Sequence, residues 1–338
     1  MRKILLGTAA LIIATPTLAA SSAAPVADTS SVSGLGIRNI GSAQMSGRIA
    51  ALAAHREADG KTTLFVGAAS GGVWKSEDGG MSFRPVFDRQ PVQSIGDIAI
   101  DPSNPKVIWV GTGESWTRNS VSVGNGVYKS VDGGETWNWV GLPNSERITR
   151  VLIDPKDGNT VYVCAPGRLW SDSADRGLYK TSDGGRTWAL IIKGANLSTG
   201  CSTVAMDPSD HNRLLAGTWD FRRKGYTFRS GGEGPEAASG SRMMESRDAG
   251  RTWTELNAGN AKGLPAQPWG RVEITFAPNN PRQVYAFVEN VRSALYVSQD
   301  GGRTFEERDR SQGMVWRPFY FSKLVVDPKD DKRVFKMN

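Results

Sequence analysis

Histidine and cysteine are scarce in this chain, whose 338 residues include only two of each. Zinc sites, iron–sulfur clusters and disulfide-dense scaffolds need more of these residues, so no metal or other cofactor is expected, and histidine-based catalysis is disfavoured. Blocks of like charge are also missing, because charged residues make up 22% of the chain and its net charge of +7 is spread along it. Nucleic-acid binding is therefore not indicated.

Glycine, proline and aromatic residues are plentiful by contrast. The chain has 39 Gly, 17 Pro, 11 Trp, 11 Phe and 7 Tyr. This composition is typical of a globular, turn-rich protein and not of a disordered one. The length allows two ordinary domains or one large all-β domain.

The first residues have the pattern of an export signal. Arg2 and Lys3 precede an apolar run at 4–14 that is too short to span a bilayer, and small residues follow at 19–23. We expect residues 1–22 to be a signal peptide, residues 23–36 to be a flexible spacer, and the mature protein to be exported to the periplasm or the extracellular space without a membrane span. A retained anchor is the alternative.

A motif of the form Ser-x-Asp-x-Gly-x-Thr-aromatic recurs five times, with spacings of 54, 51, 65 and 52 residues between its aspartates. Its glycines supply positive φ to a hairpin, its carboxylate can accept backbone N–H bonds, and its aromatic ring is expected to pack back onto the same sheet. A catalytic group is not needed five times. A structural role is therefore predicted for Asp78, Asp132, Asp183, Asp248 and Asp300.

A second element keeps the same period, namely an apolar strand that ends in Asp-Pro, as in IAIDPSNP (98–105) and VLIDPKDG (151–158). Each repeat thus predicts four short antiparallel strands, A to D, with the Asp motif between C and D. The predicted fold for 37–338 is an all-β propeller with five complete blades and part of a sixth. Because the last blade lacks strand C, we expect a truncated propeller, with residues 37–41 as a candidate closing strand. A complete five- or six-bladed ring is the alternative.

These repeats resemble the BNR or Asp-box propeller superfamily, which includes sialidases, xyloglucanases and sortilin-type receptors. The chain is most similar to large secreted bacterial proteins of the glycosyl hydrolase or sortilin-like type. The resemblance is carried by MSGRI (45–49), ASGGVWKSEDGG (69–80), GNGVYKSVDGGETW (124–137), DRGLYKTSDGGRTW (175–188) and WDFRRK (219–224). It implies that the chain is the N-terminal part of a longer protein with further domains.

Two enzymatic branches of that superfamily can be compared with individual residues. A sialidase would need an Arg-Ile-Pro motif, but Ala50 stands in the proline position after Arg48. A xyloglucanase-like enzyme typically has an acidic residue directly before the Gly-Gly that leads into the first Asp motif, where this chain has Ser70. Such an enzyme also places its two carboxylates in a cleft between two propellers, and this chain supplies one propeller.

The loops fall at two ends of the predicted propeller. The A–B turns and the Asp motifs share one end, whereas the variable B–C loops (114–125, 166–176 and 220–241) and the D–A loops share the other, where propellers place function. Aromatic faces stack on sugars or peptide side chains, and guanidinium groups pair with anions. We therefore predict ligand binding at this loop end by Trp116, Arg118, Arg168, Trp170, Trp219, Arg222, Arg223, Tyr226, Trp269, Trp316, Arg317 and Tyr320. The alternative is that the rings fill gaps between blades and the arginines cross-link loops.

Acidic residues on the same loops are candidates for a glycosidase pair, which needs carboxyl groups about 5–5.5 Å or 6.5–9.5 Å apart. These acidic residues are Glu114, Asp172, Asp175 and Asp220, of which Glu114 and Asp220 are the catalytic candidates. The favoured function is an exported propeller that binds an extracellular polysaccharide or peptide. The alternative is a glycoside hydrolase whose catalytic cleft needs a further part of the protein.

Two predictions concern the inner strands. The strand A positions Ala51, Asp97, Arg150, Thr203, Glu273 and Lys323 should line a channel, with their charges paired or bridged by water. Cys164 and Cys201 should lie at the loop-bearing ends of two strands in neighbouring blades. An oxidising compartment would permit a disulfide between them, provided that their Cα atoms lie within about 7 Å, and two buried free thiols are the alternative.

Overall fold

The computed structural model describes residues 48–231, 238–320 and 322–337. Within these ranges the chain is all-β except for one four-residue helix, α2 (Gln312–Val315). The predicted signal peptide, the spacer and the candidate closing strand at 37–41 lie outside the described residues. None of the helices in the described ranges is long and apolar enough to cross a membrane.

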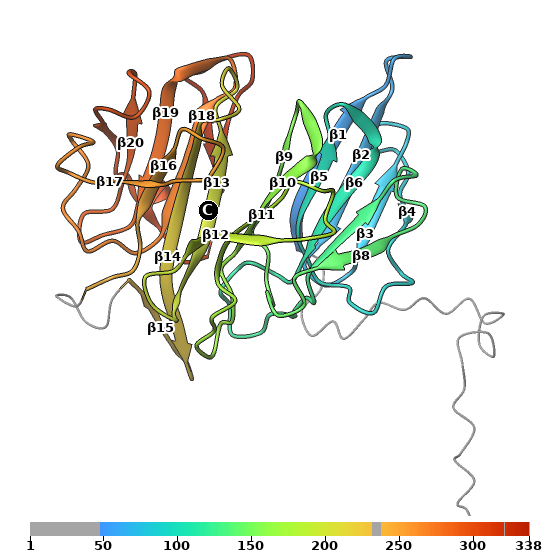
Figure 1. Ribbon diagram of the computed structural model, residues 1–338, viewed down its shortest axis with the longest axis horizontal. Coiled ribbons are helices and arrows are strands. Elements are labelled where there is room, and N and C mark those ends of the chain that lie inside the picture. The colour runs from blue at the N-terminus through green and yellow to red at the C-terminus, as the bar shows by residue number, and fades with distance from the viewer. Residues whose placement is uncertain (1–47, 232–237, 321, 338) are drawn as a thin grey trace, which may run out of the picture. The chain divides into compact units, whose positions relative to one another are not determined.

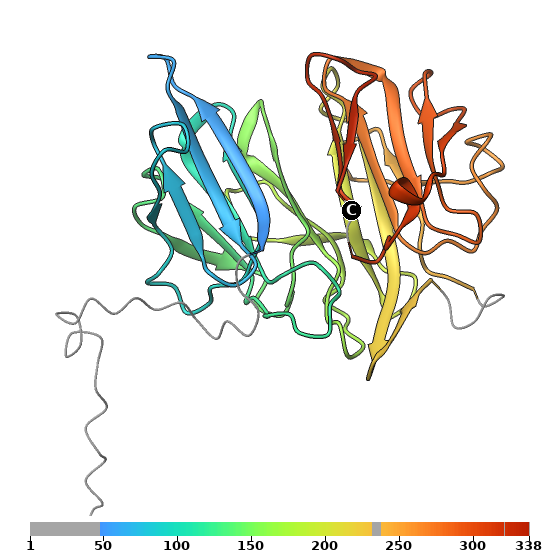
Figure 2. The ribbon, with the colours of Figure 1, turned by 180° about the vertical axis from the view of Figure 1, so that it is seen from behind.

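The strands form a succession of antiparallel sheets that follow one another in chain order (Figures 1 and 2). The first sheet contains β1 (Ile49–Arg56), β2 (Thr62–Ala68), β3 (Val73–Ser76) and β4 (Arg84–Pro85). The second contains β5 (Ile95–Asp101), β6 (Asn104–Thr112), β7 (Val127–Ser130) and β8 (Asn138–Gly141). The third contains β9 (Arg150–Asp154), β10 (Asp157–Ala165), β11 (Gly177–Thr181) and β12 (Ala189–Lys193). Each sheet keeps the predicted A–B–C–D order.

The later sheets continue this order with one addition. The fourth sheet contains β13 (Thr199–Met206), β14 (Leu214–Lys224), β16 (Met243–Ser246) and β17 (Thr254–Leu256), and β15 (Thr227–Ser230) pairs with the extended end of β14. The segment 220–241, which was predicted to be a loop, therefore begins as a β-hairpin. The fifth sheet contains β18 (Val272–Ala277), β19 (Asn280–Val288), β20 (Ala294–Ser298) and β21 (Glu306–Asp309), and a two-stranded sheet of β22 (Leu324–Val326) and β23 (Val334–Lys336) follows.

The sheets are apolar on both faces, as strand β10 illustrates. Val161 and Val163 belong to a core cluster with Trp109 of the second sheet. The alternate residues Tyr162 and Cys164 belong to a different cluster that includes Leu214 of the fourth sheet. Since successive side chains of a strand point to opposite faces, the third sheet is packed between two neighbours, as propeller blades are.

The Asp motifs close the hairpins between the third and fourth strands of the sheets. In one copy, Asp132 Oδ1 accepts backbone N–H bonds from Glu135 at 3.0 Å and from Thr136 at 2.9 Å. The glycines of the turn, Gly133 and Gly134, have φ values of 75° and 89°, a region that favours glycine. The carboxylate of Asp132 therefore stabilises the turn through hydrogen bonds within the motif.

The aromatic residue of the motif packs on the preceding sheet and not on its own, which corrects the prediction. Trp188 Nε1 donates a 2.7 Å hydrogen bond to Val140 O in β8, and its ring meets Trp109 edge-to-face with centroids 6.3 Å apart. Trp137 Nε1 likewise donates to Val86 O at 2.8 Å. Each of these two motifs thus joins one sheet to the sheet before it.

Candidate functional site

A pocket of about 510 Å³ opens at the loop end where the third and fourth sheets meet. Three segments form its walls: loop 166–176 after β10, segment 194–198 before β13, and the β14–β15 hairpin. We call this the loop-end pocket. Its lining consists of Asp172, Asn196, Leu197, Ser198, Asp220, Arg222, Lys224, Arg229 and Ala238.

Asp220 is buried at the pocket, with a side chain that is 1% exposed. Its carboxylate accepts hydrogen bonds from Ser198 Oγ at 2.6 Å, Asn196 Nδ2 at 2.9 Å and the Gly240 backbone N–H at 3.0 Å. Burial would raise the pKa of Asp220, but these hydrogen bonds outweigh it and hold the pKa below its ordinary value. The geometry suits an anionic anchor that orders the pocket, and not a proton donor.

The two arginines of the pocket, Arg222 and Arg229, are paired with its carboxylates. Arg229 Nη1 donates to Asp220 Oδ1 at 3.0 Å, and Arg229 Nη2 donates to Ser198 Oγ at 3.0 Å. Arg222 forms an ion pair with Asp172, whose side chain is 61% exposed. Asp172 is therefore the carboxylate of the pocket that faces solvent, in a setting rich in donors and acceptors for the hydroxyl groups of a sugar.

Glu114 does not line the loop-end pocket. Its fully buried carboxylate accepts two hydrogen bonds from Arg48, one from Nε at 2.9 Å and one from Nη2 at 2.6 Å. Burial raises the pKa of Glu114 in spite of this ion pair. Each of the two catalytic candidates thus has its own set of partners, and the structure gives no sign that they act as a pair.

Half of the twelve predicted ligand-binding residues are buried, namely Trp116, Trp219, Arg222, Arg223, Trp269 and Tyr320. The Trp116 ring packs against Tyr320 with centroids 5.7 Å apart, and Trp219 packs on Phe221 at 4.5 Å. Arg223 links two loops by donating from Nε to Thr117 O at 3.1 Å. These contacts are the ones expected if the rings fill gaps and the arginines cross-link loops.

The other six predicted residues are accessible at the surface. Trp170, Tyr226 and Trp316 are 47%, 95% and 54% exposed. Arg168 and Arg317 are exposed, and Arg118 is half-buried with its guanidinium 5.4 Å from the centroid of the Tyr320 ring. Trp170 lies two residues before the pocket residue Asp172 on loop 166–176.

Sequence reasoning missed Asn196, Ser198 and Arg229. The first two lie in a short D–A connection that was not among the loops singled out, although its run Asn-Leu-Ser-Thr is rich in small polar residues. Arg229 was hidden in the segment taken as a loop, and its place on β15 follows from the β14–β15 hairpin. The sequence signal for that hairpin was weak, because Phe228 is the one apolar residue in Thr227–Ser230.

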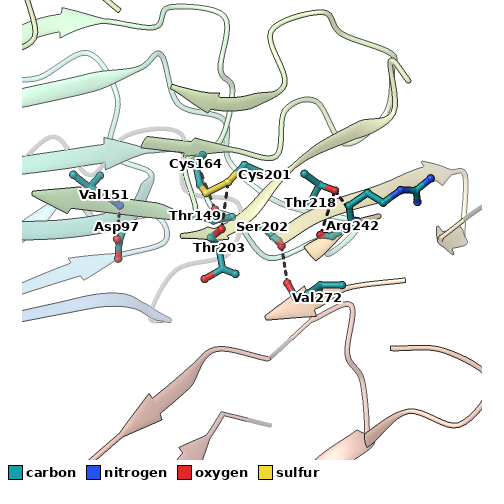
Figure 3. Close-up of a disulfide and its surroundings, with 10 residues drawn as sticks. All are labelled: Asp97, Thr149, Val151, Cys164, Cys201, Ser202, Thr203, Thr218, Arg242 and Val272. Carbon is teal, nitrogen blue, oxygen red and sulfur yellow. Dashed lines mark hydrogen bonds between the residues drawn. A yellow bond between two sulfur atoms is a disulfide. The ribbon is translucent and has the colours of Figure 1, made fainter. Parts of the chain in front are cut away.

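The inner strands are tied together by polar and covalent links (Figure 3). Cys164 of β10 and Cys201 of β13 form a disulfide with Cα atoms 4.9 Å apart, so the alternative of two free thiols is wrong in this structure. Nearby, Asp97 accepts a 2.8 Å hydrogen bond from the Val151 backbone N–H, and Ser202 donates to Val272 O at 2.7 Å.

The charges predicted to line a channel are largely paired. Asp97 lies 3.5 Å from Lys323, and Glu273 lies 2.6 Å from Arg271. Arg150, Thr203, Glu273 and Lys323 are among the residues that line a small cavity of about 50 Å³. Groups of three or more His, Cys, Asp or Glu side chains suited to hold a metal ion are absent from the described ranges.

Among known sequences, the chain is similar to curated xyloglucanases. It is 27% identical over 235 residues to a probable oligoxyloglucan-reducing end-specific xyloglucanase from Neosartorya fischeri. This match covers 62% of this chain and 26% of that protein. It is 22% identical over 285 residues to a xyloglucanase from a Paenibacillus species, and this match covers 76% of this chain and 24% of that protein. The chain thus spans about a quarter of the length of these relatives. The scan against protein-family models gives no match.

Among solved structures, the chain shares its fold with a GH74 xyloglucanase from Xanthomonas campestris, with a TM-score of 0.57 and 20% identity over 85% of this chain and 43% of that one. An ancestral GH74 enzyme gives a TM-score of 0.54 and 21% identity over 75% of this chain and 31% of that one. The chain is therefore all-β with a propeller-like fold, and its relatives are glycoside hydrolases.

Proposed function

We propose that this chain is the polysaccharide-binding propeller of a glycoside hydrolase-type protein of the Asp-box kind, and that its ligand is a xyloglucan-type β-glucan held in the loop-end pocket. The proposal departs from the broader expectation of a glycan or peptide, because the similar curated proteins are xyloglucanases. The observation that carries it is the pocket itself, where carboxylate, amide, hydroxyl and guanidinium groups converge.

The chemistry of the pocket suits a sugar. Each sugar hydroxyl can donate one hydrogen bond and accept others, so a site for it needs both acceptors and donors held at fixed positions. Asp172 supplies an exposed acceptor, and Asn196 supplies an exposed amide that is held in place by its bond to Asp220. Trp170 offers an exposed ring face on the adjoining loop for stacking.

Hydrolysis by this chain alone is not part of the proposal. Glu114 is locked to Arg48, Asp220 is saturated by its neighbours, and Ser70 stands where a xyloglucanase-like enzyme typically has an acid. Ser70 is buried, and its hydroxyl meets that of Ser122 at 2.9 Å. A hydrolytic step would need a second carboxylate to act opposite Asp172, supplied from outside these residues.

Isothermal titration calorimetry with xyloglucan oligosaccharides tests this function. We expect the wild-type chain to bind them and Asp172→Ala to weaken binding at least fivefold, because the variant removes an exposed acceptor from the pocket. Asp59→Ala is the matched control, since Asp59 is a similarly exposed carboxylate in the β1–β2 turn of the first sheet. Absence of binding, or equal weakening by both variants, would contradict the proposal.

A further inference from the structure

Arg176 is a fully buried arginine at the end of loop 166–176, and its side chain was not among the predicted site residues. Its Nη1 donates to Pro166 O at 2.6 Å and to Ser198 O at 3.1 Å. Its Nη2 donates to Ser171 O at 3.1 Å and also to Arg168 O. One guanidinium therefore folds loop 166–176 upon itself and fastens it to segment 194–198.

The same side chain reaches the third wall of the pocket. The Arg176 guanidinium carbon lies 4.8 Å from the centroid of the Phe221 ring, and Phe221 directly follows Asp220 on β14. The Phe221 backbone N–H in turn donates to Ser198 O at 3.2 Å. Burial lowers the pKa of Arg176 to about 10, so the guanidinium remains charged at neutral pH.

The disulfide joins the two strands from which loop 166–176 and segment 194–198 extend. Cys164 lies two residues before Pro166, and Cys201 lies three residues after Ser198. Both cysteines are fully buried, and Figure 3 shows them bridging two adjacent strands. The walls thus have a covalent tie at their base in addition to the hydrogen bonds from Arg176.

The fit between these segments leaves no room for larger residues. A Cβ atom on Gly200 would lie 2.3 Å from Pro166 O, and a Cβ atom on Gly167 would lie 2.2 Å from Arg176 Cγ. Gly167 also has a φ of 84°. Because the Gly200 clash involves the carbonyl oxygen that Arg176 binds, the spacing between loop 166–176 and the start of β13 is set by close contact.

We propose that Arg176 is a positioning residue for the loop-end pocket, which together with the Cys164–Cys201 disulfide fixes Asp172 on one wall relative to Asn196 and Ser198 on the other. A pocket whose walls are ordered before the ligand arrives does not spend binding free energy on ordering them. The choice of ligand rests on the proposed function above, whereas the ordering of the walls does not.

The test compares Arg176→Lys with the matched control Arg213→Lys by hydrogen–deuterium exchange. Lysine keeps the charge but cannot reach four carbonyl oxygens in the arginine geometry. Arg213 is also a buried arginine that donates to a backbone oxygen, that of Gly301, and it lies at the Asp-motif end. We expect at least tenfold faster exchange in 166–176 and 194–198 for Arg176→Lys, and no change there for Arg213→Lys.

A second variant, Cys164→Ala with Cys201→Ala, covers the case in which Arg176→Lys fails to fold, because it leaves no buried polar group unpaired. It should also speed exchange in the same two segments. In calorimetry with xyloglucan oligosaccharides, each pocket variant should weaken binding at least fivefold. If the wild type does not bind them, the proposed function fails while the exchange data still decide the positioning role. Unchanged exchange in both segments for the variants that fold would overturn the inference.

Discussion

The two ends of the sheets differ in how their contacts are built. At the Asp-motif end the same contacts recur: Lys129 donates to Gly184 O at 3.3 Å, and Lys180 donates to Ala249 O at 2.9 Å, each from one sheet to the motif of the next. At the loop end, by contrast, the hydrogen bonds from Arg176 to Pro166 O and Ser198 O join only the third and fourth sheets. Repetition thus specifies the scaffold, and the irregular end is where a ligand site can differ from one protein to another.

The largest effect expected from this difference comes from a tryptophan at each end. Trp188→Ala should lower the free energy of unfolding by about 3 kcal/mol, because it removes a half-buried ring and its hydrogen bond to the preceding sheet. Trp170→Ala should change it by less than about 0.5 kcal/mol, since the ring is exposed. Urea unfolding of both variants measures the two values.

Similar losses for the two variants would remove the distinction between a structural and a ligand-facing end. A useful second readout is the calorimetric affinity for xyloglucan oligosaccharides. It should fall for Trp170→Ala and stay unchanged for folded Trp188→Ala.

A smaller effect is expected from the pH dependence of the Asp motif. Burial alone would raise the pKa of Asp132, but hydrogen bonds from Thr136, Ser130 and Glu135 lower it to about 2, below the ordinary value of 3.8. A carboxyl whose pKa is lowered by folding stabilises the folded state above its ordinary pKa, and that contribution is lost as the pH falls from about 4 to about 2.

Asp132→Asn should therefore lose about 1 kcal/mol at neutral pH, a figure that allows for solvent screening of this exposed turn, and should lose less than the wild type on further acidification. Urea midpoints measured from pH 7 down to pH 2 provide the comparison. If the urea midpoints of the two proteins fall in parallel between pH 4 and pH 2, ionisation of Asp132 does not contribute to the stability of the folded state.

The repeated part of the molecule could be predicted from sequence because each element was seen several times. The strand order within the sheets and the turn around Asp132 follow from periodicity and from the demands of a tight hairpin. The packing direction of Trp188 did not follow, because periodicity within one repeat does not say which neighbouring sheet the ring will meet.

The loop-end pocket could be predicted only in outline. Asp172 and Asp220 were predicted at the correct end of the sheets, but their partners depend on contacts between segments far apart in the sequence. The Ser198 hydrogen bond to Asp220 and the cross-link from Arg223 to Thr117 O are examples, since each occurs once and has no counterpart to reveal it. Burial of Trp219 was equally hidden, because a tryptophan in a loop is compatible with both stacking on a ligand and packing in a core.

A crystal structure of the chain with a bound xyloglucan oligosaccharide tests the central claim most directly. The account predicts a sugar ring in the loop-end pocket, within hydrogen-bond distance of Asp172 and of Asn196 or Ser198, with an adjoining ring stacked on Trp170. Density for the sugar at the Asp-motif end, or in the groove lined by Tyr285 and Val334 between the fifth sheet and β23, would contradict it.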